Sequence, residues 1–389
     1  MSLSLKSLIP NNLNMKIGIL KESAGENRVA MLPDGVSALI KLKTNVIVEK
    51  GAGVKAFTPD REYEAAGAKI ESRATVLAES DIILTIGSPD KKEISSLREG
   101  TILLAVLNPL ADHDLVKNLA ASGLTTFSLD VIPRSTRAQA MDILSSQATV
   151  AGYKAVLDAA NRLGGFFQMF MSAAGTIKPA KVLVIGAGVA GLQAISSARK
   201  LGAVVEAFDV RTAVKEEVQS LGAKFVEVEG ARDEASAGGY AVEQTEEFKQ
   251  KQRQVIHDHA VKSDVIICTA QIPGRKAPVI LLKNTVDQME PGSVIIDLAA
   301  SSGGNCELTR DNEIVNHNDV LIVGKSNYPS EMPTDASLML GKNILNFLRL
   351  LIDDNGNLNL NFDDDIVKGT CVTHNKEIIH TRVKDSMNK

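Results

Sequence analysis

The stretch Lys181-Val-Leu-Val-Ile-Gly-Ala-Gly-Val-Ala-Gly191 decides the fold. Its residues 182–185 are apolar and mostly β-branched, which is typical of a buried strand. Gly186, Gly188 and Gly191 follow in GxGxxG spacing, where such a strand turns into a helix. The first glycine allows a tight turn, the second lets the backbone approach a pyrophosphate, and the third lets the helix pack closely on the strand.

The surrounding sequence favours dinucleotide binding over a simple glycine-rich turn, which is the alternative for the bare motif. Residues 192–200 have a helical pattern, Gly202 ends that helix, and residues 203–209 form a second strand that ends in Asp209. An acid about 20 residues past the glycines can accept hydrogen bonds from an adenosine ribose. Because this carboxylate would repel a 2′-phosphate, we expect NAD in preference to NADP, with Arg211 as an argument against.

Composition indicates a globular α/β protein of two domains. The chain has 389 residues, a net charge of −4 and no tryptophan, and no basic excess that would suggest nucleic acid. Cys268, Cys306 and Cys371 are odd in number and far apart, which fits a reducing compartment and neither a disulfide framework nor a metal site. We therefore expect no metal.

Neither a membrane span nor a secretion signal is expected. No window contains the roughly 18 uninterrupted apolar residues that a span requires, and the most apolar candidate, residues 166–177, is short and interrupted. Residues 1–14 lack the apolar core of a signal peptide, so we expect Met15 to open the first strand.

Strand and helix patterns alternate from Met15 onward, which predicts βαβ units and two doubly wound parallel-sheet, Rossmann-like domains. The first domain is expected to be discontinuous, with residues 15–142 plus 330–389, because the apolar helix at 337–352 has to be buried against it. The second, NAD-binding Rossmann domain is expected at 143–329, entered through a long bridging helix. A ligand crevice is expected between the two sheets.

Two loops stand out. Residues 229–241 combine glycines and charged residues with an isolated Tyr240, a composition that fits either a mobile flap or a passive surface loop. Residues 134–142 bring two arginines, an amide and a carboxylate to the start of the bridging helix, where a capped and solvated helix start is the alternative. The composition alone leaves both pairs of alternatives open.

These stretches together resemble the NAD(H)-binding component of proton-translocating NAD(P) transhydrogenases, over residues 15–380. The RxxRAQxMD stretch is far more specific than the glycine motif, and the GGYA sequence also belongs to the resemblance, so both loops are expected to be functional. The matching segments are Lys21–Ala30, Arg134–Asp142, Val184–Gln193, Ala237–Ala241, Ile272–Pro278, Gly303–Glu307 and Gly369–Thr373.

The resemblance implies a role for each polar residue of these loops. Arg134 and Asp142 would hold the nicotinamide end of NAD(H), and Ser145 would assist through the carboxamide. Gln139 would reach toward the NADP(H) of a partner, and Tyr240 would close over bound nucleotide. The other candidates for nucleotide contacts lie in and beside the Rossmann motif: Gly186, Gly188, Val189, Gly191, Asp209, Val210, Arg211 and Ala270.

Alanine dehydrogenase shares the resemblance and is the alternative enzyme. Deamination of an amino acid needs a lysine and a histidine for substrate and proton handling and an aspartate near the nicotinamide. Those positions correspond here to Gly87, Asn108 and Ser301, and only the carboxylate-binding arginine, Arg28, is present. Hydride transfer between two nicotinamides needs no general acid or base, only two rings held face to face.

The resemblance therefore implies a transhydrogenase of the Re/Si-specific type, which exchanges hydride between NADH and NADP⁺ and is active only with partner subunits. It implies a homodimer with a membrane-spanning and an NADP(H)-binding partner, at the cytoplasmic face of the inner membrane. The component continues into membrane helices in some relatives. Here the sequence ends at Lys389 in a polar tail, as expected of a separate polypeptide or of a piece of a longer one.

Overall fold

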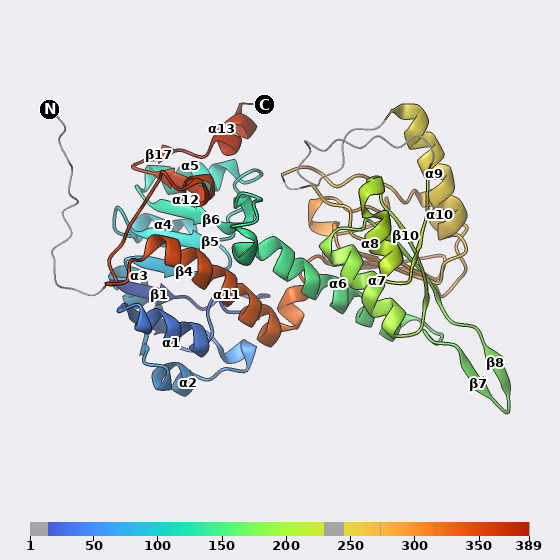
Figure 1. The fold of residues 1–389 in the computed structure, drawn as a ribbon, viewed down its shortest axis with the longest axis horizontal. Coiled ribbons are helices and arrows are strands. Elements are labelled where there is room, and N and C mark those ends of the chain that lie inside the picture. Colours follow the sequence, from blue (N-terminus) through green and yellow to red (C-terminus); the bar gives the residue numbers. More distant parts are fainter. Residues whose placement is uncertain (1–14, 229–244, 273, 389) are drawn as a thin grey trace. The chain divides into compact units, whose positions relative to one another are not determined.

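The computed structural model describes residues 15–228, 245–272 and 274–388. The chain divides into two compact units, Met1–Ile143 with Pro333–Lys389, and Leu144–Met332. Each unit contains one large, mostly parallel sheet with helices (Figure 1). The expected fold class, with two parallel-sheet Rossmann-like domains, is confirmed.

The first unit contains an eight-stranded sheet of order β17-β16-β6-β5-β4-β1-β2-β3. The six strands β1 to β6 are parallel, and β16 and β17 add an antiparallel edge next to β6. The strands are β1 Lys16–Ile19, β2 Asn45–Glu49, β3 Lys69–Glu71, β4 Ile82–Leu84, β5 Ile102–Ala105, β6 Thr125–Ser128, β16 Cys371–His374 and β17 Glu377–Ile378.

Local sequence explains where the helices of this unit begin. Asp90 caps α4 in a capping box with Glu93, Asp112 caps α5, and Asp364 caps α12. The apolar face of α11 is buried, and α11 packs beside α1 (Figure 1). The helices are α1 Pro33–Lys41, α2 Asp60–Ala65, α3 Arg73–Glu79, α4 Lys91–Ser96, α5 His113–Ala121, α11 Pro333–Leu351, α12 Asp365–Thr370 and α13 Thr381–Met387.

The second unit contains a seven-stranded sheet of order β11-β10-β9-β12-β13-β15-β14. Alternate side chains of β9 enter different apolar clusters, Val182 and Val184 in one and Leu183 and Ile185 in the other. Both faces of the central strand are therefore buried, as in doubly wound sheets. The strands are β9 Lys181–Ile185, β10 Val204–Phe208, β11 Lys224–Phe225, β12 Val265–Cys268, β13 Val294–Asp297, β14 Ile314–His317 and β15 Val320–Gly324.

The bridging helix α6, Ile143–Arg162, continues through Gly152 without a break. A side chain at this glycine would overlap the carbonyl oxygen of Ala190 in α7, so Gly152 serves close helix packing. The remaining helices of the unit are α7 Val189–Lys200, α8 Lys215–Ser220, α9 Glu246–Ala260 and α10 Lys283–Val286.

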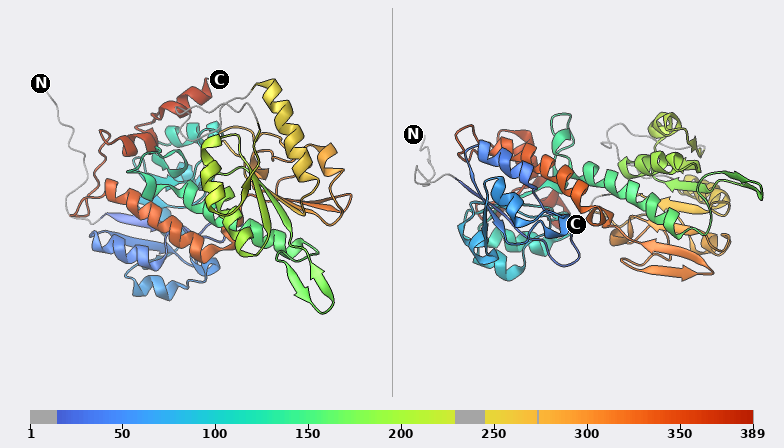
Figure 2. Two further views of the ribbon diagram at one scale, coloured as in Figure 1. Left: turned by 45° about the vertical axis from the view of Figure 1, so that its right-hand side comes forward. Right: turned by 90° about the horizontal axis from the view of Figure 1, so that it is seen from below.

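Three features of the fold differ from the sequence-based expectation. The alternating strand and helix patterns did not predict the antiparallel edge strands β14, β16 and β17. Residues 224–228, Lys-Phe-Val-Glu-Val, have the apolar alternation that predicts a strand, but only Lys224–Phe225 pairs with the sheet. Residues 170–177 form an antiparallel hairpin, β7 Phe170–Ser172 with β8 Gly175–Ile177, which projects from the second unit (Figures 1 and 2).

Candidate functional site

The glycine turn joins β9 to α7 at the carboxyl edge of the second sheet. Gly186 has a φ of +97°, and a side chain there would lie 2.6 Å from the hydroxyl oxygen of Thr269. That hydroxyl donates a hydrogen bond of 2.9 Å to the carbonyl oxygen of Gly186. The turn is thus fixed by the residue that follows β12, the strand beside β9. Strand order reverses between these two strands, which is the ligand-binding position in doubly wound sheets.

The other two glycines differ in what surrounds them. A side chain at Gly191 would overlap the carbonyl oxygen of Gly186, so this position is closed by backbone. A side chain at Gly188, the N-cap of α7, would meet no atom of the described residues within 4 Å. The backbone at Gly188 therefore faces open space at the start of a 12-residue helix, where free N–H groups can bind phosphate oxygens. Val189, the first residue of that helix, is exposed.

Asp209 follows β10 directly, and its side chain is only 6% exposed. Its Oδ2 accepts a hydrogen bond of 2.7 Å from the N–H of Ala187, inside the glycine turn. Its Oδ1 accepts from the backbone N–H of Arg211 at 2.8 Å. The Arg211 guanidinium also pairs with it, with Nε 2.9 Å from Oδ1 and Nη2 2.8 Å from Oδ2. The carboxylate thus connects the turn to the strand end where a ribose is expected.

A pocket lies beside Asp209 in the second unit. Three phenylalanines give it apolar walls, and an ion pair between Lys215 and Glu227 contributes charged groups. Val210 is partly buried against the apolar cluster on one face of the sheet, so its side chain serves packing. The lining residues are Phe208, Asp209, Thr212, Lys215, Phe225, Glu227, Val228 and Phe248.

Ala270 is held by a residue that the sequence did not single out. The side chain of the buried Asn305 accepts a hydrogen bond from Ala270 N–H at 3.0 Å and donates one to Ala270 O at 2.9 Å. Asp297, fully buried at the end of β13, accepts from the N–H groups of Asn305 and Cys306 at 2.7 and 3.0 Å. The GGNCE match was the signal that could have identified this support. The structure thus brings Ala270 and the glycine turn together through neighbouring strand ends.

The loop 133–142 belongs to the first unit and follows β6 and the short 3₁₀ helix η2, Leu129–Val131. Arg134 and Gln139 are exposed, whereas Asp142 is half-buried. Gln139 begins the 3₁₀ helix η3, Gln139–Met141, and its side chain makes no hydrogen bond within the part of the chain that the structure describes. The amide of Gln139 is thus available to another molecule.

The two remaining expected site residues are Ser145 and Tyr240. Ser145 lies in the first turn of α6, and its carbonyl oxygen accepts a hydrogen bond of 3.0 Å from the hydroxyl of Thr149. It belongs to the second unit, whereas the loop 133–142 belongs to the first. Tyr240 lies outside the described residues.

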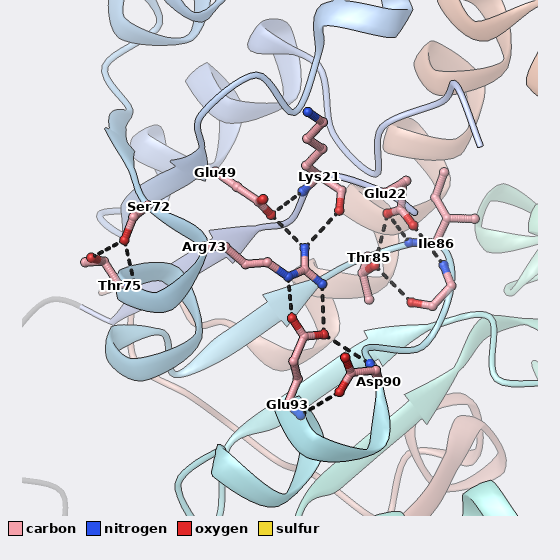
Figure 3. A network of polar contacts seen from close by, with 11 residues as sticks. Lys21, Glu22, Glu49, Ser72, Arg73, Thr75, Thr85, Ile86, Asp90 and Glu93 are labelled. Atoms are coloured by element: carbon pink, nitrogen blue, oxygen red, sulfur yellow. Dashed lines mark hydrogen bonds and ion pairs between the residues drawn. The ribbon is translucent and has the colours of Figure 1, made fainter. Parts of the chain in front are cut away.

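Gly87 is the residue that the resemblance aligns with the lysine expected of alanine dehydrogenase chemistry. It lies beside Glu22, whose carboxylate accepts hydrogen bonds from the N–H groups of Ile86 and Gly87 at 2.6 and 3.1 Å (Figure 3). The hydroxyl of Thr85 adds a third at 3.0 Å. Burial raises the pKa of Glu22, and these hydrogen bonds oppose that rise. The position of the expected lysine is thus occupied by backbone that binds an internal carboxylate.

Asn108 and Arg28 are the other relevant residues of the first unit. Asn108 adopts a φ of +47°, and near it burial raises the pKa of Asp130. Arg28 forms an ion pair with Glu26, with Nε 2.8 Å and Nη2 2.7 Å from the carboxylate oxygens. Its charge is therefore balanced within its own loop, as expected of a structural arginine.

Two global properties bear on the site. Among the described residues, no three or more histidine, cysteine or acidic side chains are grouped as a metal site would require. No helix in the same part of the chain is long and apolar enough to cross a membrane.

Comparison with known proteins assigns the family. The family description "Alanine dehydrogenase/PNT, N-terminal domain" matches residues 18–151, and "Alanine dehydrogenase/PNT, C-terminal domain" matches residues 155–381. The chain belongs to the alanine dehydrogenase/PNT family. The family implies binding of a nicotinamide nucleotide, and the predicted resemblance is confirmed.

Within the alanine dehydrogenase/PNT family the chain is strongly similar to transhydrogenases. It is 46% identical over 376 residues to the first portion of the NAD(P) transhydrogenase alpha subunit of Rhodospirillum rubrum, covering 94% of this chain and 98% of the relative. A transhydrogenase structure from Sinorhizobium meliloti superimposes with a TM-score of 0.86 at 42% identity, covering 94% of this chain and 100% of that one.

The alanine dehydrogenase of Mycolicibacterium smegmatis is only 28% identical, over 95% of this chain and 96% of the relative. The transhydrogenase interpretation is therefore favoured over the alanine dehydrogenase alternative.

Proposed function

We propose that the chain is the NAD(H)-binding component of a proton-translocating NAD(P) transhydrogenase of the Re/Si-specific type. It holds NAD(H), and hydride passes directly and reversibly between this nucleotide and NADP(H) on a partner subunit. The observation that carries the proposal is the loop 134–142, in which the matched Arg134 and Gln139 are exposed and the Gln139 amide makes no hydrogen bond to any residue that the structure describes. The relatives' designation as transhydrogenase alpha subunits supports it.

The second unit would bind the pyrophosphate and adenosine of NAD(H). The open space at Gly188 and the start of α7 fit the pyrophosphate. Asp209 accepts from the ribose hydroxyls, and the pocket with its three phenylalanine rings receives the adenine. A carboxylate at this position repels a 2′-phosphate, so NADH binds in preference to NADPH.

Arg134, Asp142 and Ser145 would hold the nicotinamide end, with Gln139 directed to the partner's NADP(H) and Tyr240 closing over the nucleotide. These are positioning roles. Transfer between two nicotinamides moves no substrate proton, and the two C4 atoms need only approach to roughly 3 to 3.5 Å. This agrees with Gly87 and Asn108, neither of which carries a titrating side chain.

The partners in this proposal are an NADP(H)-binding subunit, a membrane-spanning subunit and a second copy of this chain. The assembly lies at the cytoplasmic face of the inner membrane, with this chain peripheral. Support for the homodimer comes from the hairpin β7–β8, where Phe170 and Met171 are 42% and 71% exposed. Apolar side chains gathered on a projecting hairpin are typical of a protein–protein contact.

The first test uses the isolated chain. We expect tight binding of NADH, weak binding of NADPH, and negligible redox turnover until an NADP(H)-binding partner is added. Reduction of NAD⁺ by L-alanine, catalysed by the isolated chain, would contradict the proposal and favour an amino-acid dehydrogenase.

The second test concerns Gln139. The Gln139→Asn variant shortens the exposed side chain by one methylene and keeps its amide. We expect NADH binding to be retained and hydride transfer to NADP⁺ in the reconstituted complex to fall. Unchanged transfer would mean that Gln139 has no part in aligning the second nucleotide.

A further inference from the structure

The last segment of the chain returns to the first unit and lies against the loop 133–142. Asp364, the N-cap of α12, accepts hydrogen bonds from the N–H groups of Ile366 and Val367 at 2.8 and 3.3 Å. The same carboxylate faces the middle of the loop, 227 residues earlier in sequence. One side chain therefore both starts a helix and contacts the loop.

Arg137 makes the loop's side of this contact. Its Nη1 lies 2.6 Å from Oδ2 of Asp364, and its Nη2 lies 2.8 Å from Oδ1. Nη2 also contacts the carboxylate of Asp365. A planar guanidinium that meets a carboxylate with two parallel hydrogen bonds fixes orientation as well as distance. Arg137 holds the pKa of Asp364 below its usual range, so the carboxylate stays charged at neutral pH.

Two further anchors come from the same C-terminal segment. The carbonyl oxygen of Ala140 accepts hydrogen bonds from the side chains of Asn343 and Asn346 on α11, at 2.8 and 3.1 Å. At the start of the loop, a side chain on Gly369 would overlap the ring of Pro133, so α12 and Pro133 are in direct contact. The loop is thus held at its start, its middle and near its end.

We propose that Arg137, through its ion pair with Asp364, is a positioning residue that fixes the loop for binding the nicotinamide end of NAD(H). The inference rests on the proposed function, in which Arg134 and Asp142 contact that end of the nucleotide. Arg137 itself is engaged by Asp364 and Asp365, so its guanidinium acts on the nucleotide only through the loop that it anchors.

The physical reason is pre-organisation. The loop contains only one short 3₁₀ helix, so its backbone would otherwise sample several conformations. Binding the nucleotide would then have to order the loop, and the apparent affinity would fall by the fraction of molecules in the competent conformation. The three anchors order the loop in advance. Exposed ion pairs contribute little to the free energy of unfolding. Loss of the pair between Arg137 and Asp364 should therefore reduce the order of the loop more than the stability of the whole chain.

The experiment compares NADH with ADP-ribose, which lacks the nicotinamide, on the isolated full chain. In Arg137→Gln and Asp364→Asn we expect the Kd for NADH to rise about tenfold if the competent fraction falls to about one tenth. The Kd for ADP-ribose should stay within about twofold, since no loop residue is assigned to that half of the nucleotide. Asn retains N-capping ability, so Asp364→Asn keeps α12. Arg137→Lys, which keeps the charge but loses the fork, should give an intermediate Kd for NADH.

The matched control is Lys376→Gln. Lys376 lies in the same C-terminal segment, and the substitution breaks its exposed ion pair with Glu99, a residue outside the loop 133–142. It should leave both dissociation constants unchanged. An equal rise for NADH and ADP-ribose in the Arg137 variants, or no rise at all, would overturn the inference while leaving the proposed function intact. If the unaltered chain itself binds NADH and ADP-ribose equally well, the loop makes no nicotinamide contact, and its proposed function fails together with the inference.

Discussion

The guanidinium of Arg211 forms a bidentate ion pair with the carboxylate of Asp209, with Nε 2.9 Å from Oδ1 and Nη2 2.8 Å from Oδ2. Backbone N–H groups of Ala187 and Arg211 occupy the same two oxygens. Arg211 could favour NADP by binding its 2′-phosphate, but its guanidinium is already paired with Asp209. Asp209 itself repels a 2′-phosphate, so the pair favours NAD over NADP.

Replacing Asp209 by Asn should therefore weaken NADH binding and strengthen NADPH binding by about tenfold or more, as expected of one hydrogen bond to a charged group. The freed Arg211 would supply that bond to the 2′-phosphate. Titration of the isolated chain with each nucleotide measures both effects. In the double variant Asp209→Asn with Arg211→Gln the gain for NADPH should disappear. A gain that persists would show that loss of repulsion alone accounts for it.

Gly188 and Gly191 offer a matched pair of substitutions. Gly191→Ala places a methyl group on the carbonyl oxygen of Gly186, and overpacking of this kind costs about 1–3 kcal/mol, which thermal unfolding would detect. The methyl group added by Gly188→Ala meets no atom among the residues with described positions, so the free energy of unfolding should stay within about 0.5 kcal/mol of the unaltered value. Its methyl group nevertheless occupies the space proposed for the pyrophosphate, so its Kd for NADH should rise. If Gly188→Ala binds NADH as tightly as the unaltered chain, the pyrophosphate of NADH does not lie against Gly188.

The sequence predicts the parts of the site that are contiguous in the chain, but not those that join distant segments. The turn and Asp209 follow from local sequence, because strand, turn and helix are contiguous and their spacing has a direct geometric meaning. The support for Ala270 by Asn305 joins residues on two loops, and the pair Arg137 and Asp364 spans 227 residues of sequence, so no local pattern could indicate them. They depend on which strand ends and which chain segments the topology places side by side.

The edge strand β16 and the hairpin at 170–177 were not predicted either, because local sequence carries little signal for them. β16 pairs antiparallel with β6 although the paired residues Thr126 and Thr373 are 247 positions apart, and its own four residues carry too little periodicity to mark an edge strand. The hairpin at 170–177 was seen only as an apolar run unable to span a membrane. Its strands are exposed throughout and three residues long, so they show no alternation of buried and exposed positions.

His380 provides a pH-dependent contact in the first unit. It caps α13, where its Nδ1 accepts a hydrogen bond from Val383 N–H at 3.3 Å, and its Nε2 lies 3.0 Å from the carbonyl oxygen of Gly369. The neutral ring with its proton on Nε2 satisfies both contacts. A second proton would face the Val383 N–H. Burial also lowers the pKa of His380 below its usual 6.5.

The sign of the stability effect follows from this lowered pKa. The unfolded chain takes up a proton near pH 6.5, whereas the folded ring resists protonation, so the contribution is complete above about pH 6.5 and is lost as the pH falls through the folded pKa. We expect thermal stability to fall between pH 7 and pH 5, and more gradually in His380→Asn, which can still cap the helix. Burial lowers the pKa of His374 in the same direction, so a smaller slope should remain. Identical slopes in both proteins would exclude His380 as a contributor.

The exposed hairpin leads to a prediction about self-association. Phe166 and Phe170 stack with ring centroids 5.3 Å apart at its base, whereas Met171 is 71% exposed and takes no part in that stack. Met171→Glu should therefore leave the hairpin folded but make burial of its tip against a second copy costly, because a charge would have to be desolvated. Sedimentation of the isolated chain should then shift from dimer toward monomer. Ile314→Glu, at a 53% exposed position on the edge strand β14, is the matched control and should leave the dimer unchanged. Dissociation by the control but not by Met171→Glu would place the dimer contact at the sheet edge and leave the hairpin without a role in it.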